Sequence, residues 1–174
     1  MLVTYVLGII CGIAVLVIDQ LTKLYIISNF SLGESCGFLK GIIDIIYIHN
    51  RGAAWGMLSG YTWALLLITA VVMVVCIFIL IKQGQKNKLL FWAIVLVLSG
   101  GIGNMIDRIF RDGNVIDFLH FEFWPQFPVF NVADCAVVVG AGLLILYFVI
   151  DTVNEYRKKK EPVTAQEQTE DADI

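Results

Sequence analysis

Charge is scarce in this sequence of 174 residues. Only 16% of the residues are charged, whereas about 25% are charged in a typical soluble domain. Hydrophobic residues make up 59% of the chain, and the mean hydropathy is +0.82. A soluble fold of this length could not bury so many apolar side chains, so the composition predicts one integral membrane domain.

Several motifs of metal, covalent and nucleic-acid chemistry are also absent. The four cysteines are scattered without a Cys-x-x-Cys pair, so we expect neither a disulfide framework nor a metal site. The two histidines, His49 and His120, form no His-Glu-x-x-His pattern, and there is no Gly-x-Ser-x-Gly nucleophile elbow. No motif indicates a cofactor. The net charge of −3 leaves no basic surface for nucleic acid.

Four long apolar runs are present instead, and they predict an all-α membrane protein. Each run approaches the roughly 17 to 25 residues that a membrane-spanning helix needs. Because the runs are continuous rather than alternating, a β-barrel is disfavoured. No Lys or Arg precedes Lys23, so we expect the first run to stay attached as a helix rather than to act as a cleaved signal peptide. The predicted helices cover about 2–27, 61–81, 88–108 and 131–152.

Basic residues predict the orientation of these helices. They concentrate between the second and third runs and after the fourth, so the positive-inside rule places both segments, and both termini, in the cytoplasm. The loops at about 28–60 and 109–130 then lie on the outer face. We divide the chain into a membrane domain, 1–160, and an acidic cytoplasmic tail, 161–174, predicted to be disordered. The basic residues are Lys82, Lys86, Lys88, Arg157, Lys158, Lys159 and Lys160.

Both outer loops have features of ordered structure. Residues 42–48 are apolar and rich in isoleucine, which favours a β-strand in the first loop. The aromatic segment FEFWPQFP, 121–128, predicts a short interfacial segment in the second loop. Its aromatic rings fit an ordinary membrane-interface belt or contact with a substrate, and the sequence leaves both open.

Ionisable and amide side chains gather at the outer ends of the predicted helices. Spacings of three or four residues place the members of each group on one helix face. Inside the third run, the glycines of GGIGN at 100–104 favour close helix packing rather than phosphate binding. The groups are Asp19 with Lys23, Asn104 with Asp107 and Arg108, and Asn131 with Asp134, with Asp117 in the loop before the last group.

Spacing alone leaves several interpretations of these acids open. Asp19 with Lys23, and Asp107 with a neighbouring arginine, could be ion pairs that fix helix ends, because charges at membrane depth persist when they are paired. Asp134 could be an acid that caps the first turn of its helix. Alternatively, Asp117 and Asp134 could share one proton and act together as general acid and base in hydrolysis.

Rival functions for the same acids come from other classes. A small proton- or cation-coupled transporter could use Asp19, Asp107 and Asp134 as a relay. Such a relay should place acids on both sides of the membrane midplane, and here they all lie toward one side. A non-catalytic membrane subunit or lipid-binding scaffold is the other alternative.

Five motifs in order resemble the lipoprotein signal peptidase (signal peptidase II) family, which consists of membrane aspartic endopeptidases. The resemblance covers nearly the whole chain except the tail. It implies four membrane helices, with outer loops that form a small β-rich cradle. The motifs are DQLTK at 19–23, NRGAAWG at 50–56, GNMIDR at 103–108, VIDF at 115–118 and FNVADCA at 130–136.

The resemblance also implies roles for individual residues. Asp117 and Asp134 are the implied catalytic dyad, and Gly52 and Ala53 are expected to leave room for the bound peptide. Asp19 and Lys23 are expected to brace the cradle, with Asp107 as further structural support. The remaining residues expected to hold the substrate or support the dyad are Asn50, Asn104, Arg108, Asn131 and Ala133.

The same resemblance implies the setting and the partners. The expected location is the bacterial cytoplasmic membrane, with the active site near the outer face. The expected substrates are prolipoproteins, cleaved before a diacylglyceryl-modified cysteine, and the expected inhibitors are cyclic depsipeptides of the globomycin type. Membrane lipids are the other expected partners.

Overall fold

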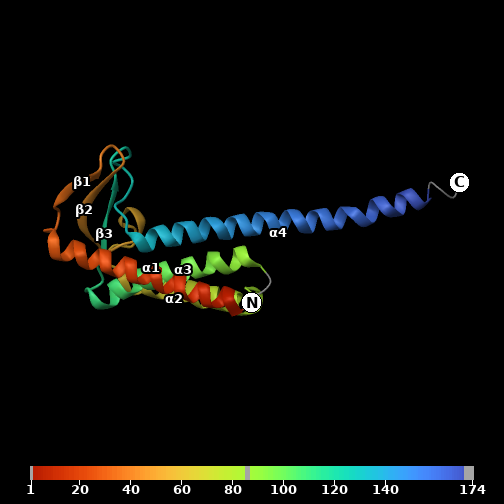
Figure 1. Cartoon of the computed structure of the whole chain (residues 1–174), viewed down its shortest axis with the longest axis horizontal. Helices are drawn as coiled ribbons and strands as arrows, with labels where there is room; N and C mark the ends of the chain where they lie inside the picture. The colour runs from red at the N-terminus through yellow and green to blue at the C-terminus, as the bar shows by residue number, and fades with distance from the viewer. Residues whose placement is uncertain (1, 85–86, 171–174) are drawn as a thin grey trace.

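The structure is a computed structural model that describes residues 2–84 and 87–170 (Figure 1). Within these residues, four helices are long and apolar enough to cross a membrane, which confirms the predicted fold class. Lys86 and residues 171–174 lie outside the described residues. The helices are α1 (Leu2–Asn29), α2 (Thr62–Gln83), α3 (Lys88–Phe110) and α4 (Val132–Glu170).

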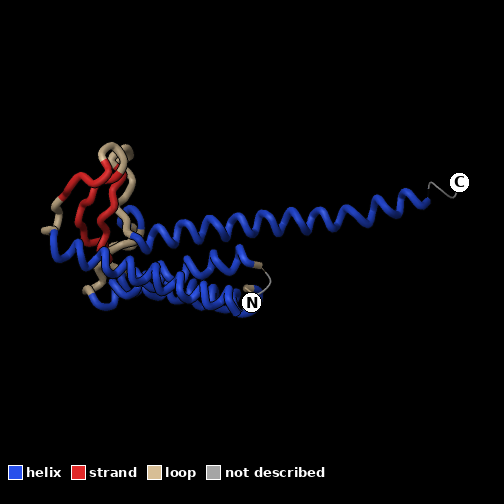
Figure 2. The backbone as a smooth tube through the Cα atoms, viewed as in Figure 1, coloured by secondary structure: helices blue, strands red, loops and turns tan. Residues whose placement is uncertain are grey.

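The fourth helix is longer than predicted. It passes the expected end near residue 152 and continues to Glu170, because the residues that follow the apolar run include good helix formers such as Glu, Lys and Arg. It extends beyond the ends of the other three helices (Figure 2). Disorder of the acidic tail, 161–174, stays a prediction.

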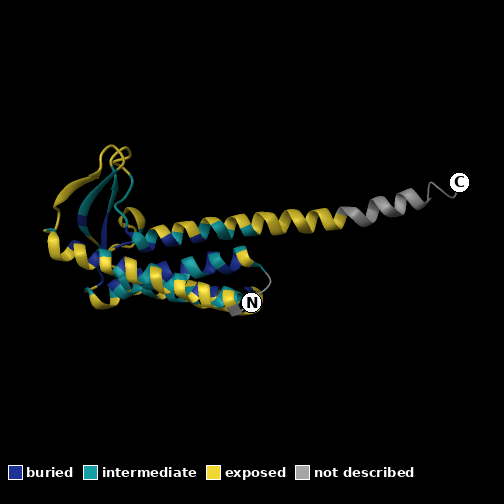
Figure 3. Cartoon of the chain, viewed as in Figure 1, coloured by how far each residue is buried: buried dark blue, intermediate teal, exposed yellow. Residues whose placement is uncertain are grey.

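The helices form a bundle whose outer surface is apolar. Trp63 on α2 is 84% exposed and Phe110 at the end of α3 is 79% exposed, and exposed positions run along the whole bundle (Figure 3). Such surfaces fit helices that face lipid rather than water. A small core between α2 and α3 contains Cys76, Leu90, Ile94 and Val97.

Close contact between α3 and α4 depends on glycine. A Cβ atom added at Gly100 would lie 2.3 Å from the Ala133 carbonyl oxygen, and one at Gly140 would lie 2.8 Å from the Ala93 carbonyl oxygen. These are distances to backbone atoms, which cannot rotate away. The glycines of GGIGN therefore do allow close packing, as predicted, and they set the depth of the first turn of α4 against α3.

A three-stranded antiparallel sheet lies at one end of the bundle, and α1 begins and α4 ends at the other end (Figure 1). The strands are β1 (Ser35–Leu39), β2 (Ile43–Asn50) and β3 (Val115–Phe121), with β2 in the centre. The sheet packs on α1 through a core that includes Ile26 and Phe118. The second loop thus contributes a strand to the sheet, which we had predicted only from the first loop, and the interfacial position of residues 121–128 stays a prediction.

Pairing with β3 also fixes the start of α4. The Phe130 carbonyl oxygen accepts hydrogen bonds from the backbone N–H groups of Phe118 and Leu119, at 3.0 and 2.8 Å, and the Phe130 N–H donates to the Leu119 carbonyl at 2.9 Å. Asn131 follows directly. The strand that carries Asp117 and the helix that carries Asp134 are therefore joined by a short backbone ladder.

Candidate active site

Asp117 and Asp134 line one cavity at the sheet end of the bundle. The cavity has a volume of about 430 Å³. Asp117 is buried on β3, and Asp134 lies half-buried in the first turn of α4. The two acids predicted as a dyad thus come from segments that are separate in sequence, and they face a common space.

A reciprocal pair of hydrogen bonds begins α4. The Asn131 side-chain oxygen accepts a hydrogen bond from the Asp134 N–H at 2.9 Å, and the Asp134 carboxylate accepts one from the Asn131 N–H at 3.1 Å. This is the geometry of a capping box, in which the residue before the helix and its third residue satisfy each other's backbone donors. Asp134 is therefore a capping residue, as one sequence interpretation allowed, and it also lines the cavity.

Asparagine amides hold both carboxylates. Asn131 Nδ2 donates to Asp117 Oδ1 at 2.6 Å, so Asn131 bonds to both acids. Asn50 Nδ2 donates to Asp117 Oδ2 at 2.9 Å, and Asn104 Nδ2 donates to Asp134 Oδ1 at 2.7 Å. Each carboxylate therefore has neutral donors on both oxygens, which fix its orientation without an adjacent salt bridge.

The environment of Asp117 favours its protonated form. Burial, and after it the nearby charge of Asp134, raise the pKa of Asp117 from 3.8 to about 7. The hydrogen bonds from Asn50 and Asn131 and the charge of Lys23 oppose this rise in the pKa. Burial and the nearby like charge therefore both favour the neutral form of Asp117.

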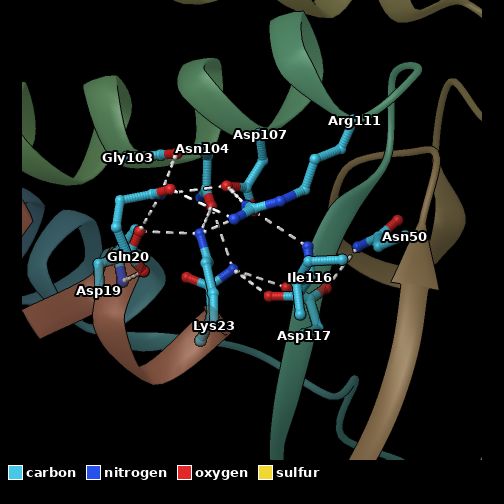
Figure 4. Close-up of polar contacts among 12 residues, drawn as sticks. Asp19, Gln20, Lys23, Asn50, Gly103, Asn104, Asp107, Arg111, Ile116 and Asp117 are labelled. Atoms are coloured by element: carbon cyan, nitrogen blue, oxygen red, sulfur yellow. Dashed lines mark hydrogen bonds and ion pairs between the residues drawn. The ribbon is translucent and has the colours of Figure 1, made fainter. Parts of the chain in front are cut away.

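Beside the cavity, a buried ionic network links α1 to α3. Lys23 Nζ lies 2.9 Å from an Asp19 oxygen and 3.0 Å from an Asp107 oxygen, and all three side chains are fully buried (Figure 4). Arg111 also pairs with Asp107. The local ion pairs predicted from spacing are therefore present. Removing one partner of such a buried pair typically destabilises a protein by about 3 to 5 kcal/mol.

Asp19 and Asp107 also bond to backbone groups. Asp19 Oδ1 accepts the Ala133 N–H at 2.9 Å, and Asp107 Oδ2 accepts the Ile116 N–H at 3.1 Å. Asp19 and Lys23, which we expected to brace the cradle, thus contact the ends of α3 and α4 rather than the sheet, and only Asp107 reaches a strand.

Arg108 and the segment after β2 form another wall of the cavity. The Arg108 guanidinium donates to the Gly52 carbonyl oxygen at 2.9 Å, while its Nε is buried without a partner among the described residues. A Cβ atom added at Gly52 would lie 2.7 Å from the Met57 carbonyl oxygen. The lack of a side chain at Gly52 is therefore needed by its own loop, and both Gly52 and Ala53 line the cavity.

Our sequence interpretation assigned no role to Gln20 or to the Ile116 N–H, and it listed Ala133 as a substrate-binding or supporting residue without identifying its N–H as the contacting group. Gln20 donates to both Asp19 and Asp107, at 3.0 and 3.1 Å. The backbone N–H groups of Ile116 and Ala133 donate hydrogen bonds to Asp107 and Asp19 respectively, as described above. Gln20 lies inside the DQLTK motif, so the motif could have identified it, whereas a backbone donor leaves no signal in residue type.

This arrangement can carry out general acid–base chemistry. Two carboxyl groups line the same cavity, and a pair of this kind can supply a general acid and a general base when one member is protonated and the other ionised. Among the described residues, no group of three or more His, Cys, Asp or Glu side chains is placed to hold a metal ion. Together, the fold and the site define a multi-pass membrane protein with a cavity that contains two acids at one end of its helices.

Comparison with known proteins identifies the family. The family model described as Signal peptidase (SPase) II matches residues 11–150, and the chain belongs to this family. It is accordingly a peptidase, a hydrolase of peptide bonds, that resides in a membrane. The alternative prediction of a small transporter is not supported by any of these comparisons.

Individual relatives agree with this assignment. The chain is 44% identical over 148 residues to the lipoprotein signal peptidase of Bacillus pumilus, covering 84% of this chain and 92% of that protein. It is 37% identical over 153 residues to the lipoprotein signal peptidase of Halalkalibacterium halodurans, covering 87% and 96% respectively.

Solved structures show the same fold. A bacterial membrane enzyme structure obtained by the in meso method at 2.3 Å resolution superposes with a TM-score of 0.79 at 32% identity, covering 84% of this chain and 90% of that one. A second structure with the same description, at 1.9 Å resolution, gives a TM-score of 0.75 at 33% identity, covering 81% and 91%.

Proposed function

We propose that this protein is an aspartic endopeptidase of the bacterial cytoplasmic membrane that removes signal peptides from prolipoproteins. The observation that carries the proposal is the cavity in which Asn131 bonds to both Asp117 and Asp134. The names of the relatives support the substrate class. The bond cleaved is the one before the diacylglyceryl-modified cysteine.

The proposed reaction uses the two acids in complementary roles. The ionised carboxylate removes a proton from a water molecule as its oxygen attacks the scissile carbonyl carbon. The protonated carboxyl group donates its proton to the carbonyl oxygen. When the tetrahedral intermediate collapses, the C–N bond breaks, a proton passes to the leaving nitrogen, and the pair returns to its singly protonated form.

Other residues of the cavity have supporting roles in this proposal. Asn50, Asn104 and Asn131 orient the dyad, and the free Nε of Arg108 offers a donor to a substrate carbonyl. Val138 and Val139 line the cavity and are also exposed on the lipid-facing side of α4. The substrate's acyl chains can stay in lipid along this side, which holds the scissile bond at the depth of the dyad.

The proposed orientation follows the basic residues. Both termini lie in the cytoplasm, and the sheet and the cavity lie near the outer face, where the translocated part of a precursor is found. Cyclic depsipeptides of the globomycin type are the proposed inhibitors of the cavity.

Cleavage by purified protein tests the proposal. A precursor with the diacylglyceryl group should be cut once, directly before the modified cysteine, as judged by product masses, and a globomycin-type depsipeptide should stop the reaction. The same precursor without the lipid should be cut at least tenfold more slowly, because it loses its anchoring. If folded Asp117→Asn or Asp134→Asn protein cuts the modified precursor at the parent rate, the aspartic mechanism is wrong.

A further inference from the structure

The buried ionic network connects to both members of the dyad through the protein backbone. The N–H of Ile116, the residue directly before Asp117, donates a hydrogen bond to the Asp107 carboxylate. The N–H of Ala133, the residue directly before Asp134, donates a hydrogen bond to the Asp19 carboxylate. The two acids of the network thus occupy matching positions with respect to the two acids of the cavity.

The ammonium group of Lys23 contacts both of these supporting carboxylates, those of Asp19 and Asp107. Lys23 Nζ contacts Asp19 and Asp107 at 2.9 and 3.0 Å, as Figure 4 shows. The two supporting carboxylates are therefore bridged by Lys23 Nζ, and also by Gln20 Nε2 as described above. Because each carboxylate is bonded to the backbone beside one catalytic acid, a change at Lys23 reaches β3 and α4 together.

A second route runs from Lys23 through a side chain. Lys23 Nζ donates to Asn104 Oδ1 at 3.1 Å, and Asn131 Nδ2 donates to the same oxygen at 3.0 Å. With its oxygen held by these two donors, the Asn104 amide must present its nitrogen to Asp134, where the distance is 2.7 Å. Lys23 and Asn131 together therefore determine which end of the Asn104 amide faces the dyad.

We propose that Lys23, Asp19 and Asp107 are positioning residues of the dyad. Lys23 supplies the charged bridge between the two carboxylates that bond to the backbone segments carrying Asp117 and Asp134, and Gln20 supplies a neutral one. This inference rests on the proposed function. The three residues do not line the cavity, so they act through the dyad and touch no substrate. A role limited to fixing helix ends would account for the bond to Ala133 in the first turn of α4, but it would require neither the bond to Ile116 nor the bond to Asn104.

Kinetics of variants with nearly unchanged side-chain shape test the proposal. Lys23→Met removes the ammonium group and should lower kcat about 100-fold, because a misplacement of about 1 Å at a reacting group has an effect of this size. KM should stay within about twofold of the parent value, since the cavity lining is unchanged. Rates are normalised to folded protein, measured by monodisperse elution and the thermal midpoint in micelles.

Two further variants keep the test decisive if Lys23→Met does not fold. Asp19→Asn and Asp107→Asn preserve shape but weaken the contact with Lys23, and each should lower kcat at least tenfold at unchanged KM. The matched controls are Lys82→Met and Asp151→Asn at the other end of the bundle, which should keep the parent kcat. Folded Asp19→Asn and Asp107→Asn proteins with parent kcat would overturn the proposal.

The pH profile separates positioning from a merely structural role. The charge of Lys23 lowers the pKa of Asp117, so Lys23→Met should move the alkaline limb of kcat/KM to higher pH. An unchanged profile in folded Lys23→Met protein with the parent kcat would count against the proposal. The other charged groups that face this site are Asp19 on α1, Asp107, Arg108 and Arg111 on α3, and Asp134 on α4.

Failure of this inference and failure of the proposed function give different results. If Asp117→Asn stays active, the dyad itself is wrong. If Asp117→Asn is inactive while Lys23→Met has the parent kcat, only the positioning role is wrong. In the combined Lys23→Met, Asp117→Asn variant, we expect no further loss beyond Asp117→Asn alone, because Lys23 acts through the dyad.

Discussion

At the scale of single residues, the account depends on the protonation of Asp117. Its side chain is 1% exposed and bonded to two asparagine amides. Neutral donors orient a carboxyl group without forcing it to ionise as strongly as a cation would. The site therefore keeps a proton available near neutral pH while holding the acid still.

The pKa of Asp117 predicts the pH dependence of activity. With a pKa raised to about 7, the proton that the dyad donates is lost above that pH. We expect kcat/KM to fall about tenfold for each pH unit well above pH 7. The measurement is the initial rate of precursor cleavage between pH 5 and 9, and a flat profile from pH 6 to 9 would contradict the prediction.

The same shift predicts a change in stability with pH. Folding raises the pKa of Asp117 from 3.8 to about 7, so the folded state binds this proton more tightly. The resulting stabilisation is fully present below about pH 4 and disappears as the pH rises through about 7. Between pH 5 and 8, the thermal midpoint should fall more for the parent than for Asp117→Ala, and equal changes would show that Asp117 is not the group responsible.

Residue types in the sequence identified the candidate acids but not their supports. Asp117 and Asp134 lie in recognisable motifs, and the Asp19–Lys23 pair follows from a spacing of four. The contact between Lys23 and Asp107 joins separate helices, and the bonds to Ile116 and Ala133 involve backbone groups. Neither kind of contact has a signature in a single sequence.

At the scale of elements, the first turn of α4 is both a helix cap and part of the site. Asn131→Ser keeps an oxygen that can cap the Asp134 N–H, whereas Asn131→Ala does not. A serine hydroxyl is too short to replace the bond to Asp117. We expect both variants to lose about 100-fold in kcat, but only Asn131→Ala to lose a further ~1 kcal/mol of stability from the missing cap.

Thermal midpoints and single-turnover rates of both proteins check this separation. If Asn131→Ser cleaves at the parent rate, the bridge between Asn131 and Asp117 is dispensable. If the two variants are equally stable, the capping role of Asn131 is wrong.

Two glycines of α4 provide a matched test of helix packing. A Cβ atom at Gly140 would lie 2.8 Å from the Ala93 carbonyl oxygen, whereas one at Gly142 meets nothing within 4 Å. We expect Gly140→Ala to lower stability by about 1 to 3 kcal/mol and Gly142→Ala to leave it unchanged or raise it by up to about 1 kcal/mol. Thermal midpoints of the two variants give the comparison, and equal values would contradict the close α3–α4 contact.

The spanning helices could be predicted from the sequence, while β3 could not be placed. Long apolar runs mark helices that cross a membrane, and their starts agreed with the structure. The strand β3 has only seven residues, and its burial depends on packing against α1 and β2. Its environment comes from tertiary contacts that pattern alone does not supply.

At the scale of the whole molecule, the cavity lies at one end of the bundle and a separate group of basic residues lies toward the other end. The cavity and the sheet are at one end, and Lys82, Lys88 and Arg157 are toward the other. The positive-inside rule then predicts that the sheet is outside the cytoplasm.

Native Cys36 on β1 is exposed and allows a direct test of this orientation. A membrane-impermeant maleimide should label Cys36 in right-side-out vesicles, and Cys36→Ala should remove that label. In a Cys36→Ala background, Lys159→Cys should be labelled only in inverted vesicles. Labelling with the reverse sidedness would contradict the predicted topology.

The most direct test of the central claim is a comparison of kcat for Asp117→Asn, Asp134→Asn and the double variant, measured on equal amounts of folded protein with the diacylglyceryl-modified precursor. Residues that act as one unit have strongly non-additive effects, because removing either one disables both. We predict that both single variants fall to the same residual rate as the double variant. A single variant that keeps substantial activity, or losses that multiply in the double variant, would contradict a shared-proton dyad.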